Sequence, residues 1–187
     1  MAGAPAPVQA SGPLTPADGR ELEAALARIL RNAATPRRGR ERRVIITERA
    51  ANGFLRFQAV DGLPPGLTEP ALRMEAGGRL TVTVTVDLDA VREQQAPGRF
   101  NPLRFLSGSL PVTAVGTVRT ARRMLTIDIE SARIGSLSVP VALVAELVQI
   151  YTRSDQYPDG IDVSEPIPLP SGIDAVRIEP QRTVVVQ

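Results

Sequence analysis

The chain has no histidine, no cysteine, no lysine and no tryptophan among its 187 residues. Without histidine and cysteine there is no Ser-His-Asp triad, no cysteine nucleophile and no metal site built from these two ligands. Without lysine there is no Schiff base and no P-loop lysine. Paired carboxylates are the remaining acid–base option. We therefore expect a protein that is not an enzyme and that uses no cofactor.

Two acidic clusters are the candidates for such carboxylate chemistry. Asp87 and Asp89 lie two residues apart in "VDLDAV", and a solvated strand end is the favoured explanation for them. Asp155, Asp159 and Asp162 in "SDQYPDGID" suggest a calcium loop, but their spacing departs from the EF-hand pattern. A turn accounts for them, and we predict no metal site.

The charge pattern gives no sign of a nucleic-acid partner. The 22 basic residues are all arginine and are nearly balanced by 20 acids, for a net charge of +2. The densest basic run, residues 37–43, contains no aromatic residues on which bases would stack. We therefore predict no nucleic-acid binding. The missing cysteines leave the redox compartment open.

The first ten residues, "MAGAPAPVQA", are rich in alanine and proline and are similar to a mature N-terminus behind a start methionine. This similarity predicts a removed targeting segment and a periplasmic or secreted protein. No window of about 18 apolar residues indicates a membrane-spanning helix. We expect residues 1–13 to be disordered and residues 14–187 to form one domain.

The N-terminal third predicts two helices around a short strand. Thr15 as N-cap, followed by Pro16 and Asp18, starts a helix that ends before Pro36. A strand over 44–46 precedes a second helix that is capped by Thr47. Gly53 inside this helix indicates close approach to a neighbouring element. Residues 61–70 are expected to form a loop.

The middle of the chain predicts antiparallel strands. In "RLTVTVTVDLDAV" (79–91), apolar residues face one side and threonines the other, which is typical of a sheet covered on one face. Residues 110–119 and 124–134 form a second hairpin. A largely apolar helix follows over 139–153, with Pro140 in its first turn.

The C-terminal part is expected to hold a poorly pairing extended loop over 155–172 and then two short strands around 179–181. The predicted class is therefore α+β, a curved antiparallel sheet wrapped over amphipathic helices.

Three short motifs resemble a family. They are "ITERAANGFLRF" (46–57), Leu110-Pro111-Val112 followed by Gly116, and Leu169-Pro170-Ser171-Gly172-Ile173. Together they resemble the LmeA-like secreted bacterial phospholipid-binding proteins, related to tubular lipid-binding (TULIP) domains. The likeness covers residues 43–187. Ala51 and Gly53 depart from it, because bulkier helix formers are typical beside the asparagine.

The resemblance implies a half-pipe in which acyl chains lie between sheet and helices, and a role in lipid binding or shuttling in the bacterial envelope. The ligand would be a phospholipid or another molecule with an acyl chain. The expected lipid contacts are the apolar residues Leu22, Leu26, Phe54, Leu55, Phe57, Val82, Val84, Leu143, Leu147, Ile150 and Tyr151.

The segment "PGRFNPLRFLSG" (97–108) combines apolar and basic residues between helix breakers. It either closes one end of the core or forms a portal loop that contacts a membrane surface through Phe100, Leu103, Arg104, Phe105 and Leu106. Arg56 and Arg104 are the candidate head-group contacts, because guanidinium matches phosphate geometry.

A second hypothesis remains open beside lipid binding. The same apolar residues would then form a filled core, and strand edges or the apolar helix would dock a partner protein. The sequence alone does not choose between a cavity and a core, and it leaves the oligomeric state unknown.

Overall fold

The computed structural model describes residues 12–35, 41–63, 66–87, 89, 108–153, 157–170 and 172–187, apart from the side chains of residues 147, 150 and 151. Residues 1–11, residues 37–40 of the basic run, and residues 97–107 of the portal segment, Arg104 included, lie outside this part. The predictions made for them therefore stay predictions.

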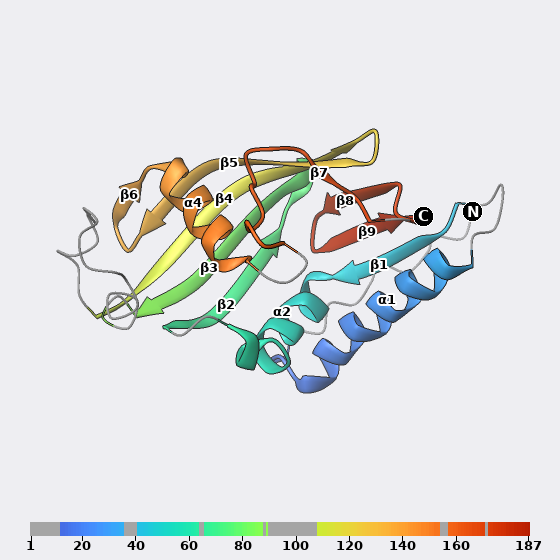
Figure 1. Ribbon diagram of the computed structural model, residues 1–187. Helices are drawn as coiled ribbons and strands as arrows, with labels where there is room; N and C mark the ends of the chain where they lie inside the picture. Colours follow the sequence, from blue (N-terminus) through green and yellow to red (C-terminus); the bar gives the residue numbers. More distant parts are fainter. Residues whose placement is uncertain are drawn as a thin grey trace, which may run out of the picture.

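The described chain is α+β with antiparallel strands, as expected (Figure 1). Its helices are α1 (Pro16–Ala34), α2 (Glu48–Phe57) and α4 (Val141–Tyr151), with 3-10 turns η1 (Val60–Gly62) and η2 (Ala76–Gly78). Its strands are β1 (Arg43–Thr47), β2 (Leu67–Met74), β3 (Arg79–Asp87), β4 (Ser109–Ala121), β5 (Met124–Ile134), β6 (Leu137–Val139), β7 (Ile167–Pro168), β8 (Ala175–Glu179) and β9 (Arg182–Val186).

The strands divide into two sheets, whereas the sequence pattern predicted one. The larger sheet has the order β2-β3-β4-β5-β6, and β7 also pairs with β5. The smaller sheet has the order β1-β9-β8, so that the first strand joins the C-terminal hairpin. Alternation reports which face of a strand is apolar, but it does not report which strand lies beside it.

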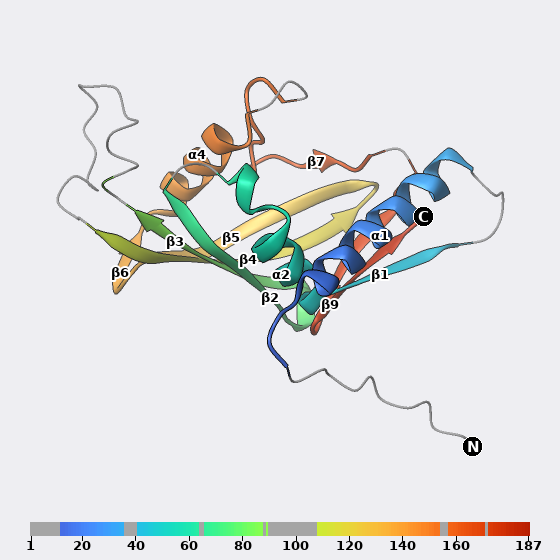
Figure 2. The same ribbon diagram turned by 90° about the horizontal axis from the view of Figure 1, so that it is seen from below.

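The tightly buried core belongs to the smaller sheet. Ala25 and Ile29 of α1 pack against Val44 of β1 and Val185 of β9. Figures 1 and 2 show α1 alongside these strands and α4 over the larger sheet. The apolar residues Ala25 and Ile29 of α1 therefore pack against the smaller sheet, whereas α4 lies over the larger one.

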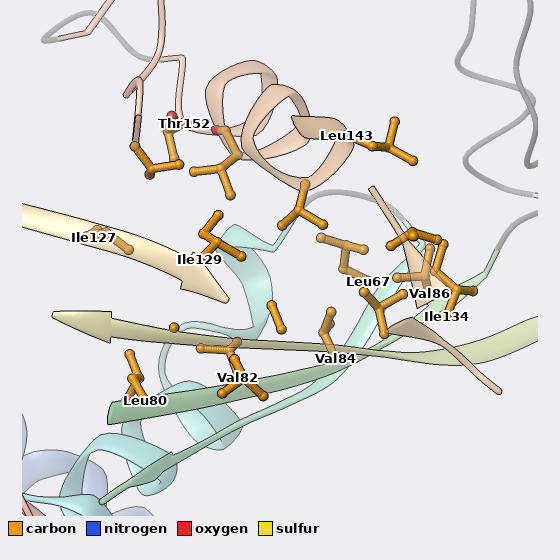
Figure 3. A pocket seen from close by; sticks show the side chains of 18 of the residues that line it. Leu67, Leu80, Val82, Val84, Val86, Ile127, Ile129, Ile134, Leu143 and Thr152 are labelled. Atoms are coloured by element: carbon orange, nitrogen blue, oxygen red, sulfur yellow. Dashed lines mark hydrogen bonds between the residues drawn. The ribbon is translucent and has the colours of Figure 1, made fainter. Parts of the chain in front are cut away.

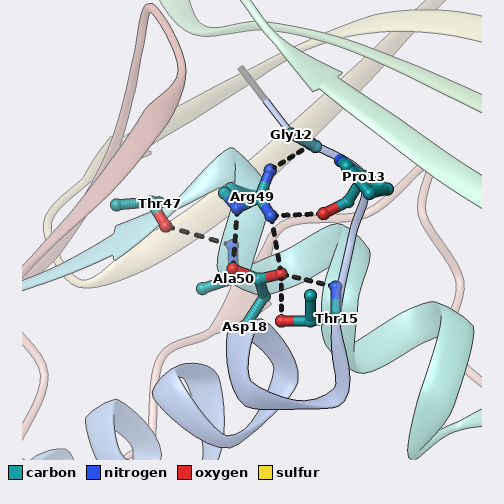
Figure 4. A network of polar contacts seen from close by, with 7 residues as sticks. All are labelled: Gly12, Pro13, Thr15, Asp18, Thr47, Arg49 and Ala50. Atoms are coloured by element: carbon teal, nitrogen blue, oxygen red, sulfur yellow. Dashed lines mark hydrogen bonds and ion pairs between the residues drawn. The ribbon is translucent and has the colours of Figure 1, made fainter. Parts of the chain in front are cut away.

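The contact between α1 and α2 confirms the close approach expected at Gly53. A Cβ atom at this position would lie 2.7 Å from the Asp18 Cβ and 2.7 Å from the Gly19 amide nitrogen. Beside it, both Asp18 carboxylate oxygens accept hydrogen bonds from Arg49, at 2.7 and 2.9 Å (Figure 4). Arg49 also donates to the carbonyls of Gly12 and Pro13, which holds the start of α1 against α2.

The threonine–glutamate–asparagine motif of α2 covers the free edge of β2. The Thr47 hydroxyl caps the helix by accepting from the Ala50 amide at 3.0 Å. The Glu48 carboxylate accepts from the Met74 amide at 2.6 Å. The Asn52 side chain donates to and accepts from the backbone of Leu72, both at 2.8 Å. The Glu48 and Asn52 side chains therefore take the place of a neighbouring strand along β2 and block edge-to-edge pairing there.

Three predicted boundaries are wrong. β2 already begins at Leu67, inside the expected loop, because a bulge between Thr68 and Ala71 lets the edge strand accommodate Pro70. The helix expected from residue 139 begins at Val141, because Val139 pairs with β5 as part of β6, and Pro140 is the N-cap. The expected loop 155–172 includes the two-residue strand β7.

A bulge in β5 keeps the apolar face of the larger sheet continuous. Val115 pairs with Ser131, but Gly116 pairs with Ile129, so Glu130 is the extra residue. The extra residue shifts the alternation by one, which places Ile129 and Ile134 on the same face although their numbers differ in parity.

Candidate functional site

A pocket of about 470 Å³ lies between α4 and the larger sheet (Figure 3). Its described lining is almost entirely aliphatic and comes from β2 to β6, α4 and the loop that follows it. The lining residues are Leu67, Leu80, Val82, Val84, Val86, Val112, Ala114, Val115, Gly116, Val118, Ile127, Ile129, Ile134, Val139, Leu143, Val144, Val148, Thr152 and Val163.

Strand alternation builds the floor of this pocket. The even-numbered residues of β3 point to one face, and the cross-strand partners of Val82 and Val84 on β4 are Ala114 and Val112. The apolar face predicted for β3 is thereby confirmed for residues 80–86. Leu88 lies outside the described part.

The opposite wall is one face of α4. Leu143, Val144 and Val148 are spaced by one and four residues, which places them on one side of a helix. The C-terminal end of α4 is tied to the following loop. The Thr152 hydroxyl donates to the Val148 carbonyl and accepts from the Ile161 amide, both at 2.7 Å.

The described lining of the pocket has no charged residue, and Thr152 is its one polar side chain. Because the Thr152 hydroxyl already has both a donor and an acceptor partner, it has little left to offer a ligand. The described lining therefore offers a ligand hydrophobic contact and, apart from the engaged Thr152 hydroxyl, no polar side chain.

Most of the apolar face of the larger sheet is only partly covered by the side chains that the structure describes. Val82 is 40% exposed although it lies in the middle of a strand, and most of the described lining residues are half-buried. By contrast, Val44 in the smaller sheet is 1% exposed. Protein interiors are normally close-packed. The described residues therefore leave a space between α4 and the sheet, where the alternative expectation was a filled core.

Three of the predicted lipid contacts, Val82, Val84 and Leu143, line the pocket. The side chains of Leu147, Ile150 and Tyr151 on α4 lie outside the described part.

The remaining predicted contacts belong to α1 and α2 and do not line this pocket. On α1, Leu22 is half-buried and Leu26 is 42% exposed. On α2, Phe54 and Leu55 are half-buried and Phe57 is 37% exposed. Arg56 is exposed, with its guanidinium carbon 5.9 Å from the centre of the Phe57 ring, and it is not among the lining residues.

Sequence reasoning missed most of the floor. The same alternation that identified β3 is present in "LPVTAVGTV" and "LTIDI", so the residues of β4 and β5 carried a readable signal. Val139 and Val163 carried none, because they come from a three-residue strand and from a loop. Their place in the pocket depends on pairing with β5 and on the anchor at Thr152.

The acidic residues organise turns. The Asp89 amide donates to the Asp87 carboxylate at 3.0 Å, and the Gly108 amide donates to Asp89 at 2.9 Å. Asp162 accepts from the hydroxyl and the amide of Ser164, and these bonds lower the pKa of Asp162 below its usual value. Asp155 lies outside the described part.

Among the described residues, no group of acidic side chains is arranged to hold a metal ion. Within the same part of the chain, no helix has the length and apolar character needed to cross a membrane.

No protein-family model matches the sequence, and a search of the curated proteins finds no match. The geometry of the pocket therefore carries the functional argument.

Proposed function

We propose that the protein binds the acyl chain of a lipid in the pocket between α4 and the larger sheet, without catalysing a reaction. The observation that carries this proposal is an unfilled space whose described walls are aliphatic and uncharged. Its volume falls within the range of about 300–1,000 Å³ that is usual for small-molecule sites. Flexible valine, leucine and isoleucine walls suit a chain that has no fixed shape.

We further propose that the bound lipid is carried in the bacterial envelope. This part of the proposal depends on the motif resemblance and on the alanine- and proline-rich N-terminal segment. A carrier needs to shield a hydrocarbon chain from water and release it again. A pocket that binds by hydrophobic contact alone, with no bond to break, meets both needs.

The first test is native mass spectrometry of the purified protein, followed by organic extraction and lipid analysis. We expect a stoichiometric lipid mass that changes with the lipid composition of the host. A lipid-free mass, together with no uptake from phosphatidylglycerol–phosphatidylethanolamine vesicles, would contradict the proposal.

Neighbouring residues of β3 offer a matched pair of variants that places the lipid. Val84→Asp puts a carboxylate into the pocket, whereas Thr83→Asp puts one on the opposite face of the same strand. We expect Val84→Asp to lose the lipid and Thr83→Asp to keep it, because a charge in an apolar site without a partner is costly. Circular dichroism establishes that both variants are folded. Equal retention by both would show that the lipid binds elsewhere.

A second candidate function, docking of a partner protein, is favoured by the outer edge of β5. β7 pairs with residues 124–125 and β6 pairs with residues 132–134. Within the described ranges, no strand pairs with residues 126–131 on that side, so an extended peptide has an edge to which it can add. This function would be favoured if the purified protein carries no lipid but captures a partner protein, and if the variant Ile129→Pro loses that capture.

A further inference from the structure

We propose that the pocket recognises only the uncharged hydrocarbon part of its ligand and leaves the polar head group outside, so that the tail decides affinity. This inference rests on the proposed function, because it assigns the ligand chemistry of the same pocket. It predicts that the described pocket selects lipids by chain length and not by head-group charge. A head-group contact at Arg104, as expected from the sequence, would instead appear as a preference for anionic lipids.

The first argument is the lack of a polar partner inside. Among the described lining residues there is no arginine, aspartate or glutamate, and the Thr152 hydroxyl is already bonded to Val148 and Ile161. The floor strands β3 and β4 are each paired on both sides, so their backbone groups are engaged in the sheet. A carboxylate or phosphate placed among these residues would lose its hydration and gain nothing in return.

The second argument is the match between the walls and a hydrocarbon tail. The described lining holds no aromatic residue, so no flat ring restricts the ligand to one shape. Each further methylene that is buried should tighten binding by about fourfold, until the space is filled. Chain length is therefore the variable to which affinity responds.

The test uses two ligand series in competition with a fluorescent acyl probe at an ionic strength of about 0.15 M. In one series the acyl chain is constant and the head group is zwitterionic lysophosphatidylcholine, anionic lysophosphatidylglycerol or neutral monoacylglycerol. In the other the head group is constant and the chain lengthens by two carbons at a time. Every ligand is used below its critical micelle concentration.

We expect dissociation constants within about threefold across head groups, and tightening of roughly tenfold or more per two added carbons. A difference of about tenfold or more between head groups on the same chain, or no response to chain length, would overturn the inference while leaving lipid binding intact. Absence of binding by every ligand, probe included, would instead refute the proposed function.

Discussion

Filling the pocket with a protein side chain separates a ligand cavity from a core. Ala114 lies in the middle of β4, between Val82 on β3 and Ala132 on β5, and it lines the pocket. In the variant Ala114→Phe the ring would extend into the space of about 470 Å³. A buried phenylalanine side chain contributes about 1.5–3 kcal/mol. Where the space is already filled, overpacking costs about 1–3 kcal/mol instead.

The structure predicts that Ala114→Phe is neutral or stabilising and loses the lipid. After loss of side-chain rotamer freedom, a net gain of about 1–2 kcal/mol remains. For a chain of this size, this gain corresponds to a rise of roughly 2–8 °C in Tm. Differential scanning fluorimetry on delipidated protein measures the shift, and native mass spectrometry measures the retained lipid.

The control is Thr113→Phe, on the neighbouring residue and the opposite face of β4. It adds the same ring outside the pocket and should keep the lipid. A fall of several degrees in Tm for Ala114→Phe alone would mean that the space is occupied by packed side chains, and the reasoning would fail. A raised Tm with full lipid retention would show that the pocket is real but is not the lipid site.

Three further predictions concern the scaffold. Gly53→Ala forces a Cβ to within 2.7 Å of α1 and should destabilise the fold by about 1–2 kcal/mol, after the gain in helix propensity is subtracted. Gly62 has open space around it, so the control Gly62→Ala should be neutral. Chemical denaturation measures both variants, and equal effects would contradict the close approach. Asn52→Leu leaves the backbone amide and carbonyl of Leu72 on β2 without their side-chain partners. In the same assay it should lower the free energy of unfolding by about 1–3 kcal/mol. An unchanged free energy of unfolding would contradict this prediction. Hydrogen bonds from Arg49 hold the pKa of Asp18 below its usual 3.8. Their stabilisation is therefore complete about one unit above the unfolded pKa and is lost as pH falls through the lowered pKa. The difference in Tm between wild type and Asp18→Asn should be constant above about pH 5 and shrink below it. A difference that is the same at pH 3 and pH 7 would be inconsistent with this role.

The sequence was most informative where a local rule acts alone. Thr15, Pro16 and Asp18 predicted the start of α1, and alternation over residues 79–87 predicted β3 with its apolar face. Gly53 predicted close approach to a neighbouring element, and the structure shows that this element is α1. Lipid binding and location in the envelope stay predictions, as does the curvature of the sheet.

Local sequence patterns were thus sufficient for the α+β class, for most of the helices and strands, and for the apolar face of β3. These follow from interactions between residues close together in the chain. The pairing of β1 with β9 in a separate sheet, the packing of α1 and α2 away from the pocket, and the space that the described residues leave under α4 are features of the tertiary structure. Each of these depends on contacts between distant segments, and apolar periodicity is the same whether the facing surface is a side chain, a ligand or water.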